Sequence, residues 1–292
     1  MVAAERTAPS FMALEKEGRL YREVKQRVRP LLPQLLLNQR EALYFAKYGE
    51  VEMHLLEFLC RRDRDAIDVG ANYGGYVHFM RRYARHVYAY EPIPRLAQML
   101  RRKFGRDVTI EAIALSDSTG SAALRMPVID GVAVAGCSTI SDGASATYPA
   151  LSVTEVPMDR LDNVYGGDVG FIKIDVEGHE QAVLDGAIDT IRRCLPRIQV
   201  EIEERLAPGE LARARAFFAK LGYRGFFVHN GRMERIEQFS LAEMQDPMNL
   251  PDLKAPLEKR QRVERYVYNF IFLPANEPNE TAHKMSERLA QL

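Results

Sequence analysis

Residues Asp65–Pro92 read D-A-I-D-V-G-A-N-Y-G-G-Y-V-H-F-M-R-R-Y-A-R-H-V-Y-A-Y-E-P and predict a strand, a glycine loop, a helix and a second strand. The short apolar run that ends at Val69 is typical of a buried strand. It stops at Gly70, where the absence of a side chain allows a tight bend and close approach to another group. The second strand ends on Glu91. Pro92 ends the backbone hydrogen bonding of that strand, because proline has no amide proton. This order of elements predicts a ligand at the glycine loop of an α/β sheet.

The chemistry of the loop indicates which ligand. The dinucleotide fingerprint G-x-G-x-x-G has its second glycine where this chain has Asn72, so a bound pyrophosphate is disfavoured. Asp68 would repel a phosphate but suits a ligand that carries an ammonium and a sulfonium group. Glu91 follows Gly70 by 21 residues, the distance at which a Rossmann-type sheet presents a carboxylate to ribose hydroxyls. These residues favour S-adenosylmethionine over the alternative, a turn without a nucleotide.

Composition narrows the class of partner and the compartment. Among the 292 residues, 40 are Lys or Arg and 40 are Asp or Glu, so no net charge favours nucleic acid. Cys60, Cys137 and Cys194 lack metal-ligand spacing and are typical of free thiols in a reducing compartment. The first residues lack a secretory pattern, and no run of 18 apolar residues occurs. We therefore expect a cytoplasmic protein without stable membrane insertion.

The length suits one domain with an extension. We expect an N-terminal helical extension over 1–49, the α/β domain over 50–274 and a polar C-terminal tail over 275–292. The apolar stripe of the extension favours packing on its own domain, with a membrane surface or a partner groove as the alternatives. The same helices would offer copies of the chain a surface for homo-oligomerisation.

Several elements are expected after the second strand. A third strand is predicted over 108–115, followed by Ser116 and Asp117 where a polar side chain could accept from an adenine amino group. An added strand is expected over 121–128. The segment 129–150 is rich in Gly, Ala, Ser and Thr and is longer than most connections, which predicts a mobile lid over the acceptor or an acceptor-binding loop.

A cluster of polar residues follows the next buried strand. The run F-I-K-I predicts a strand that ends at Asp175, and one helix is expected from there to Cys194. Asp175, Glu177 and His179 would then lie at the carboxyl edge of the sheet, where α/β proteins bind ligands. The chain should finish with a fifth strand, a helix, a turn at Asn230-Gly231 and an antiparallel pairing at the sheet edge.

The motifs D-V-G-A-N-Y-G-G-Y, Y-E-P, A-L-S-D-S-T-G, L-D-N and I-K-I-D-V-E-G-H-E occur in the order and spacing of one family. The chain resembles the FkbM family of S-adenosylmethionine-dependent methyltransferases from about Glu50 to about Leu273. The resemblance implies a class I methyltransferase, Rossmann-like α/β fold with a seven-stranded, mostly parallel sheet whose last strand is antiparallel. It also implies O-methylation of a hydroxyl on a sugar, a glycan or another natural product.

The resemblance also implies roles for individual residues. Active-site roles fall on Asp175 and Glu177, whereas many family members have a small residue at the position of His179, which leaves the assignment of the base open. Cofactor-binding roles fall on the glycine loop and the ends of the second and third strands, namely Asp68, Gly70, Asn72, Gly74, Glu91 and Asp117. Apart from the resemblance, we expect their neighbours Tyr73, Pro92 and Ser116, together with Asp175 at the end of the fourth strand, to contribute to the cofactor site.

Transfer to a hydroxyl requires a proton acceptor. His179 is favoured by its ordinary pKa, with Asp175 and Glu177 as alternatives or as groups that orient it. The three side chains could also hold Mg²⁺ or Zn²⁺, but hard cations prefer more oxygen ligands than this run supplies, so no metal is predicted. The competing functions are a regulatory or scaffold protein with a cofactor fold and a nicotinamide-dependent oxidoreductase, which Asn72 disfavours.

Overall fold

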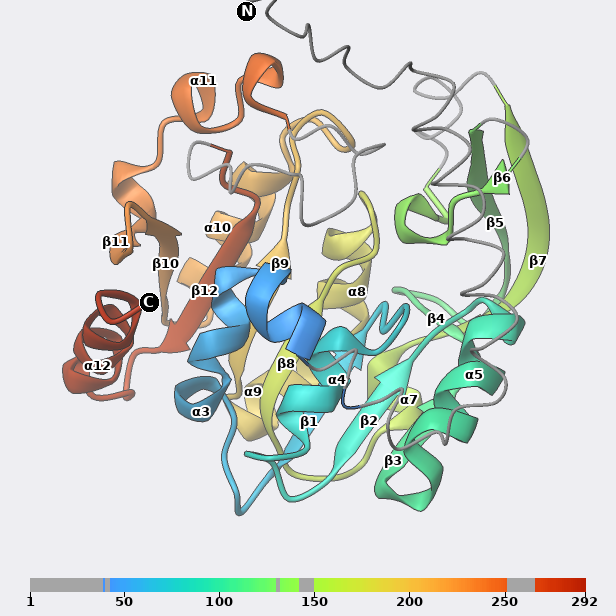
Figure 1. The fold of residues 1–292 in the computed structure, drawn as a ribbon, viewed down its shortest axis with the longest axis horizontal. Coiled ribbons are helices and arrows are strands. Elements are labelled where there is room, and N and C mark those ends of the chain that lie inside the picture. Colours follow the sequence, from blue (N-terminus) through green and yellow to red (C-terminus); the bar gives the residue numbers. More distant parts are fainter. Residues whose placement is uncertain (1–38, 40–42, 130–131, 142–149, 251–265) are drawn as a thin grey trace, which may run out of the picture. The chain divides into compact units, whose positions relative to one another are not determined.

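The main sheet contains eight strands in the order β11-β10-β12-β9-β8-β1-β2-β3 (Figure 1). The computed structural model describes residues 39, 43–129, 132–141, 150–250 and 266–292. The chain divides into two units, Met1–Tyr44 and Phe45–Leu292, and the second contains the sheet. The expected N-terminal extension lies almost entirely outside the described residues. The strands are β1 Asp65–Val69, β2 Val87–Tyr90, β3 Val108–Glu111, β8 Val169–Ile174, β9 Arg197–Glu201, β10 Tyr223–His229, β11 Arg232–Arg235 and β12 Asn269–Pro274.

Strand directions confirm the predicted mostly parallel sheet with an antiparallel last strand. β3, β2, β1, β8 and β9 run parallel, and β12 lies antiparallel to both β9 and β10. The expected count of seven strands is wrong, because the sheet has eight, and β12 lies inside it between β9 and β10. The expected antiparallel pairing at the sheet edge is confirmed between β10 and the eighth strand, β11. The turn between them is confirmed at Asn230 and Gly231, both with positive φ.

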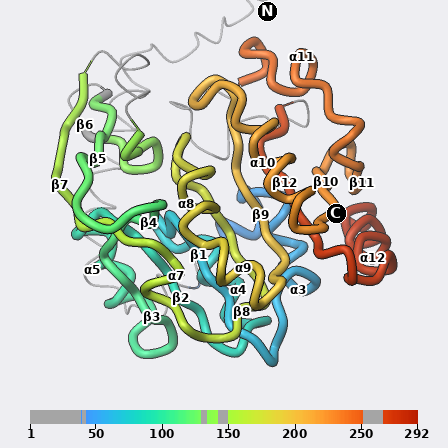
Figure 2. The backbone as a smooth tube through the Cα atoms, turned by 180° about the vertical axis from the view of Figure 1, so that it is seen from behind, coloured from blue at the N-terminus to red at the C-terminus, as the bar shows by residue number. Residues whose placement is uncertain are grey.

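Helices cover both faces of the main sheet, and this explains why β1 and β8 are buried along their whole length. Ile67 and Val69 pack on one face and Ala66 on the other. Figure 2 shows the face covered by α8 Glu180–Gly186, α9 Ile188–Cys194 and α10 Glu210–Lys220. The other face is covered by η2 Val51–Leu55, α3 Leu56–Leu59, α4 Gly75–Met80 and α5 Pro94–Phe104. Among the helices of the described residues, none has both the length and the hydrophobicity that a membrane crossing requires.

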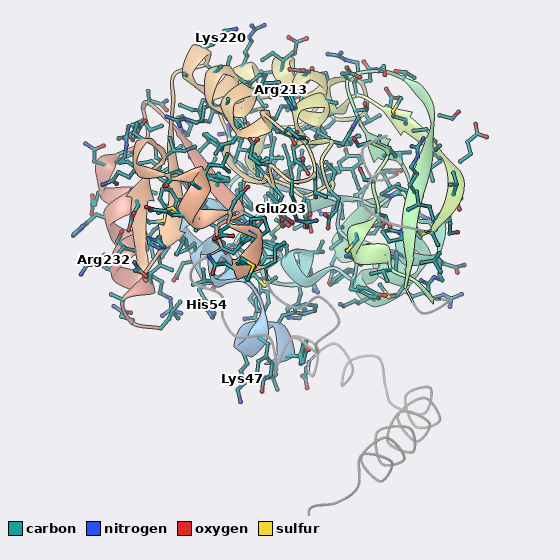
Figure 3. All side chains as sticks on the ribbon, turned by 90° about the horizontal axis from the view of Figure 1, so that it is seen from above. Lys47, His54, Glu203, Arg213, Lys220 and Arg232 are labelled. Atoms are coloured by element: carbon teal, nitrogen blue, oxygen red, sulfur yellow. The ribbon has the colours of Figure 1, made fainter. Side chains whose placement is uncertain are left out.

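Charged side chains on the helices mostly point away from the sheet. Figure 3 shows Arg213 and Lys220 on the outer side of α10, whereas Glu203 lies inside the molecule. Glu203 is buried and accepts hydrogen bonds from Arg205 and from the hydroxyl of Tyr266. The buried carboxylate of Glu203 therefore has specific partners, as burial of a charge requires.

A second sheet lies beside the first, in the order β4-β7-β5-β6. The third strand was expected to continue to Leu115, but β3 ends at Glu111 and the chain crosses to the second sheet, where Ala114–Leu115 pairs with β7. β3 is an edge strand and pairs with β2 on one side only, so no second neighbouring strand of the main sheet holds the chain beyond Glu111. The added strand is confirmed as β5. Bounds in this sheet are β4 Ala114–Leu115, β5 Gly120–Ile129, β6 Val132–Ala133 and β7 Leu151–Asp159, with η4 Ala135–Cys137 after β6 and α7 Leu161–Val164 after β7.

The single helix expected after β8 is two helices, α8 and α9. The break is at Ala187, whose φ of −113° and ψ of 6° are not helical. Gly186 approaches the second sheet so closely that a Cβ there would lie 1.8 Å from the backbone oxygen of Ser116. The helix therefore changes direction where it packs on the loop after β4.

The C-terminal residues 275–292 contain a helix, α12 Asn279–Leu289. Its Met285 and Leu289 are buried in the same core as α3 and α4. Arg197 of β9 donates to both carboxylate oxygens of Glu277, just before the helix. This segment is therefore packed on the α/β domain.

Gly70 occupies the tightest contact between β1 and β8, and its replacement should destabilise the fold. Its φ is +84°, and a Cβ would lie 1.9 Å from the backbone oxygen of Asp175. Gly231 has a similar φ of +69° but open space around it, so Gly231→Ala is a matched control for backbone strain alone. We expect Gly231→Ala to cost about 1–2 kcal/mol in the free energy of unfolding, and Gly70→Ala at least about twice as much because backbone atoms must also move. Equal losses for the two variants in urea unfolding would contradict the steric explanation.

Candidate functional site

A pocket lies at the carboxyl ends of β1, β2 and β8. One wall is formed by the main sheet and its loops, and the other by the second sheet and η4. Residues on the main-sheet side are Val69, Gly70, Asn72, Tyr90, Glu91, Pro92, Ile93, Asp175, Val176, Glu177 and His179. Residues on the other side include Ile113, Ala114, Leu115, Leu124, Ala135, Gly136, Ser138, Thr139 and Ile140. The pocket therefore lies where the two sheets meet.

The glycine loop is held by Glu91 at the end of β2. Asn72 has a left-handed φ of 48°, and its backbone N–H donates to Glu91 Oε2 over 2.7 Å. Glu91 Oε1 accepts from the backbone N–H of Ile93 over 2.9 Å. Burial raises the pKa of Glu91, although the two amide hydrogen bonds oppose the shift. The carboxylate that the sequence assigns to a ribose thus also orders the loop, and each oxygen keeps a second lone pair for a ligand.

Three buried polar atoms around the pocket have no hydrogen-bond partner among the described residues. They are Asp68 Oδ1, Asn72 Oδ1 and Ser138 Oγ. Asp68 is only 1% exposed, and burial raises its pKa to about 7. An unpaired buried polar atom costs free energy, so these atoms favour a ligand that offers hydrogen-bond donors or positive charge.

A buried lysine fixes Asp175. Lys173 is 3% exposed, and its Nζ donates to Asp175 Oδ2 over 2.7 Å and lies 4.5 Å from the centre of the Tyr76 ring. Burial lowers the pKa of Lys173, but the carboxylates around it, Asp175 and Asp68 first among them, outweigh this effect and raise it above its ordinary value. Lys173 is therefore charged, and it restricts Asp175 to one orientation.

The polar face that carries Lys173 continues across the sheet. Asp68 on β1 and Gln199 on β9 are its register partners, so all three side chains emerge on the same face. Gln199 donates to the hydroxyl of Tyr76 over 2.7 Å and to Asn269 Oδ1 over 2.9 Å. A hydrogen-bonded layer of polar side chains thus lies beneath the carboxyl edge of the sheet.

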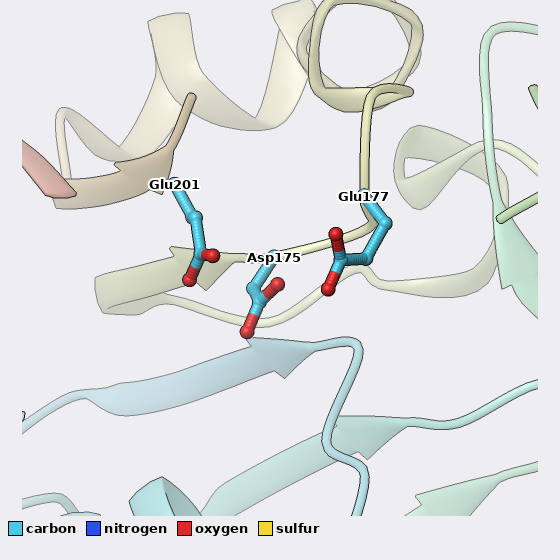
Figure 4. Close-up of side chains that lie close together, drawn as sticks. All are labelled: Asp175, Glu177 and Glu201. Carbon is cyan, nitrogen blue, oxygen red and sulfur yellow. The ribbon is translucent and has the colours of Figure 1, made fainter. Parts of the chain in front are cut away.

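Three carboxyl groups converge at this edge. Figure 4 shows Asp175 at the end of β8, Glu177 in the following loop and Glu201 at the end of β9. One oxygen of each lies within 4.8 Å of the others. Burial, followed by the charge of Asp175, raises the pKa of both Glu177 and Glu201 well above its usual value. Neutral carboxyl groups can donate as well as accept hydrogen bonds, which suits recognition of hydroxyl groups.

The grouping of possible metal ligands differs from the one considered from the sequence. Glu201, rather than His179, completes the set with Asp175 and Glu177. With one oxygen from each of the three residues, the set offers fewer ligand atoms than Ca²⁺ takes, and Mg²⁺ would need waters to complete its coordination. The absence of a required metal remains a prediction.

His179 lies just before α8 and faces the second sheet. Its Nε2 is 2.9 Å from the hydroxyl oxygen of Ser116, which is itself buried. Burial lowers the pKa of His179, and the nearby charge of Asp117 opposes this shift. The imidazole is therefore neutral at physiological pH and has the form required of a proton acceptor.

The structure brings some of the predicted site residues into the pocket and leaves others outside its lining. Tyr73 is 48% exposed and Gly74 packs on Leu100 and Phe104 of α5, while Asp68 is buried behind the lining. Those in the lining are Gly70, Asn72, Glu91, Pro92, Asp175, Glu177 and His179. Predicted residues outside it are Asp68, Tyr73, Gly74, Ser116 and Asp117.

Other residues of the site were not predicted from the sequence. Lys173 within an apolar strand and Glu201 at the end of the next strand carried a signal, because buried charges at a sheet edge suggest function. The pocket wall from η4 lies in the segment 129–150, whose composition predicted a cover for the acceptor but, without a periodic pattern, did not indicate which of its residues line the pocket.

The proposed lid is partly anchored. Thr139 and Arg125 of β5 exchange two backbone hydrogen bonds of 2.8 and 3.0 Å, and Val134 donates to the backbone oxygen of Pro127. This part of the 129–150 segment is therefore held against the second sheet as a wall of the pocket, which argues against a freely moving lid there. Residues 130–131 and 142–149 of the predicted lid lie outside the described residues.

Comparison with known proteins identifies the family. The model of the methyltransferase FkbM domain matches residues 68–224. No curated protein gives a significant match.

Solved structures give weaker similarities. The methyltransferase FkbM from Methylobacillus flagellatus KT is 14% identical over 73% of this chain and 44% of that chain, with a TM-score of 0.45. This chain thus spans less than half of that protein. An rRNA methylase from Streptococcus thermophilus is 8% identical over 76% of this chain and 93% of its own, with a TM-score of 0.39. A putative methyltransferase from Streptococcus mutans in complex with SAH is 10% identical over 76% of this chain and 94% of its own, with a TM-score of 0.40.

At these values the structures say nothing about the acceptor. The domain match covers more than half of the sequence and contains the glycine loop, Glu91 and the carboxyl edge of β8. The chain belongs to the FkbM family of methyltransferases.

Proposed function

We propose that this protein transfers the methyl group of S-adenosylmethionine to a hydroxyl oxygen of a sugar, a glycan or another natural product. The observation that carries this proposal is the shared pocket. It joins the glycine loop and Glu91, which suit the cofactor, to Asp175, Glu177 and His179, which suit a hydroxyl acceptor. A polyhydroxylated acceptor would find both donors and acceptors among the three converging carboxyl groups.

The cofactor of the family, S-adenosylmethionine, fits the residues present. Glu91 would hold the ribose hydroxyls, and the unpaired oxygens of Asp68 and Asn72 would favour the positively charged methionine part. The hydroxyl of Ser138 adds a donor and acceptor from the opposite wall. When bound, the cofactor supplies an electrophilic methyl group on a sulfonium.

The chain itself must orient the acceptor and take its proton. We assign proton acceptance to the neutral imidazole of His179, a role typically worth 10² to 10⁴-fold in rate. Asp175, fixed by Lys173, would orient the hydroxyl. Alignment of reacting groups can contribute about 7 to 11 kcal/mol, so such orientation matters at least as much as the base.

A methyl-transfer screen tests the proposed reaction. The purified chain would be incubated with S-adenosylmethionine labelled in the methyl group and with panels of sugars, hydroxylated natural products, amines, thiols and RNA. We expect label in hydroxylated acceptors, recovered as methyl ethers. Transfer to nitrogen or sulfur would overturn the assignment to oxygen, and tight cofactor binding without any turnover would favour a regulatory or scaffold role.

Substitution of Glu91 should weaken cofactor binding. Hydrogen bonds to a charged group are worth about 1.5–3 kcal/mol each, so Glu91→Gln should raise the dissociation constant of S-adenosylhomocysteine by about tenfold or more in calorimetry. Glu91→Ala should cost more, because it also releases the N–H of Asn72. Glu111→Gln, at the exposed end of β3, is the matched control and should bind normally. Normal affinity in Glu91→Gln would remove Glu91 from the cofactor site.

The role of His179 predicts a particular pH profile. Burial favours the neutral form, so its pKa lies below the ordinary value. Because the neutral form is active, turnover should be constant near pH 7 and fall only as the pH drops below about 6.5, the ordinary value for histidine. His179→Ala should lower turnover by about 100-fold and leave S-adenosylhomocysteine affinity nearly unchanged, whereas substitution of the exposed His283 of α12, His283→Ala, should have no effect. Wild-type turnover and an unchanged profile in His179→Ala would move the role to Asp175 or Glu177.

A further inference from the structure

The loop between β8 and α8, residues 175–179, carries all three proposed acceptor-side residues but has no regular structure. Glu177 has a φ of +56° and Gly178 a φ of +91°, two consecutive left-handed residues. The conformation of Glu177 is uncommon for a residue with a side chain. Such a loop keeps its shape only if other groups hold it.

The groups that hold this loop belong to Glu180. Its Oε1 accepts from the backbone N–H groups of Val176 and Gly178, both over 3.1 Å, and its Oε2 also lies 3.1 Å from the N–H of Gly178. The side chain is 2% exposed, so water does not compete for these bonds. One carboxyl group thus binds the backbone on both sides of Glu177.

A second buried carboxyl group lies behind the first. Glu210 at the start of α10 is also 2% exposed, and its Oε1 accepts from the N–H of Gln181 over 2.9 Å. Gly178 approaches Leu206 so closely that a Cβ there would lie 3.2 Å from the Cβ of Leu206. The loop after β8 is therefore fixed against the segment that follows β9 and Glu201.

We propose that Glu180, supported by Glu210, is a positioning residue for methyl transfer: its buried carboxyl group holds the Val176–Gly178 backbone in the conformation that directs Asp175 and Glu177 to the acceptor. This inference rests on the proposed function. Glu180 itself does not touch the acceptor, since it is not in the pocket lining.

The acceptor atom of Glu180 determines which substitution should preserve its role, because Oε1 accepts from both N–H groups. Burial, followed by the neighbouring Glu210, raises the pKa of Glu180 well above its usual value. A glutamine has the size of a glutamic acid, and its carbonyl oxygen can still accept from both N–H groups. An alanine removes both acceptors.

The test compares Glu180→Ala and Glu180→Gln with wild type in the full-length protein. Hydrogen exchange at Val176–Gly178 should be about tenfold or more faster in Glu180→Ala, since the two N–H groups lose their partner. Its kcat on an acceptor found with wild type should fall by about tenfold or more, because small displacements of reacting groups are costly, while the dissociation constant of S-adenosylhomocysteine changes by less than about threefold. Glu180→Gln should retain near wild-type exchange and kcat.

Glu204→Ala is the matched control for lost backbone acceptors. Glu204 accepts from the N–H groups of Gly209 and Leu211 at the start of α10, but it makes no hydrogen bond to the loop after β8. Its loss should lower thermal stability without faster exchange at Val176–Gly178 and without lower kcat. If Glu180→Ala does not fold, Glu210→Ala takes its place and is compared with Glu180→Gln by the same measurements. Exchange at Val176–Gly178 should then be faster in Glu210→Ala and unchanged in Glu180→Gln.

Asp175→Asn, measured in parallel, separates the two proposals. Unchanged exchange at Val176–Gly178 in Glu180→Ala would overturn the positioning role. Faster exchange with normal kcat would overturn it as well, provided that Asp175→Asn lowers kcat. If Asp175→Asn and Glu180→Ala both have normal kcat, the proposed active site itself is wrong.

Discussion

The close approach of β1 and β8 at Gly70 is the constraint on which the rest of the site depends. A side chain at Gly70 would meet the backbone oxygen of Asp175 at 1.9 Å, so only glycine allows the two strand ends to lie side by side. This contact brings the loop that we propose binds the cofactor next to the loop that carries the proposed acceptor-side residues. The glycine is therefore needed first for the packing of two loops, and only secondarily for space around a ligand.

Electrostatics then determine the orientation of the groups at this edge. Burial of a lysine costs several kcal/mol unless it is paired. Around Lys173 the carboxylates of Asp175, Asp68, Glu50 and Glu201 outweigh that cost, which is why its pKa rises rather than falls. The same burial raises the pKa of Glu177 and of Glu201 well above its usual value, and the charge of Asp175 adds to both shifts.

The second sheet changes the picture of the pocket. From composition, the segment after β5 resembled a mobile cover for the acceptor, yet its residues 134–141 are hydrogen-bonded to β5 and form a fixed wall opposite Glu91. Backbone pairing, which composition does not reveal, gives this wall its stability. The hydroxyl of Ser138, which has no hydrogen-bond partner within the described part of the chain, is a polar group of the pocket that comes from outside the main sheet.

The sequence by itself determined the fold class, the parallel core and the family. The spacing between the glycine loop, the strands and the acidic residues at Gly70, Glu91 and Asp175 follows from local geometry, so it can be recognised in the sequence. It also indicated the polar residues at the end of β8. Tertiary structure alone decided that β12 lies inside the sheet and that Glu201 joins Asp175 and Glu177. It likewise decided that His179 pairs with Ser116 and that Glu180 holds the loop around Glu177. These features depend on contacts between segments far apart in the chain, whose register and burial no local pattern encodes.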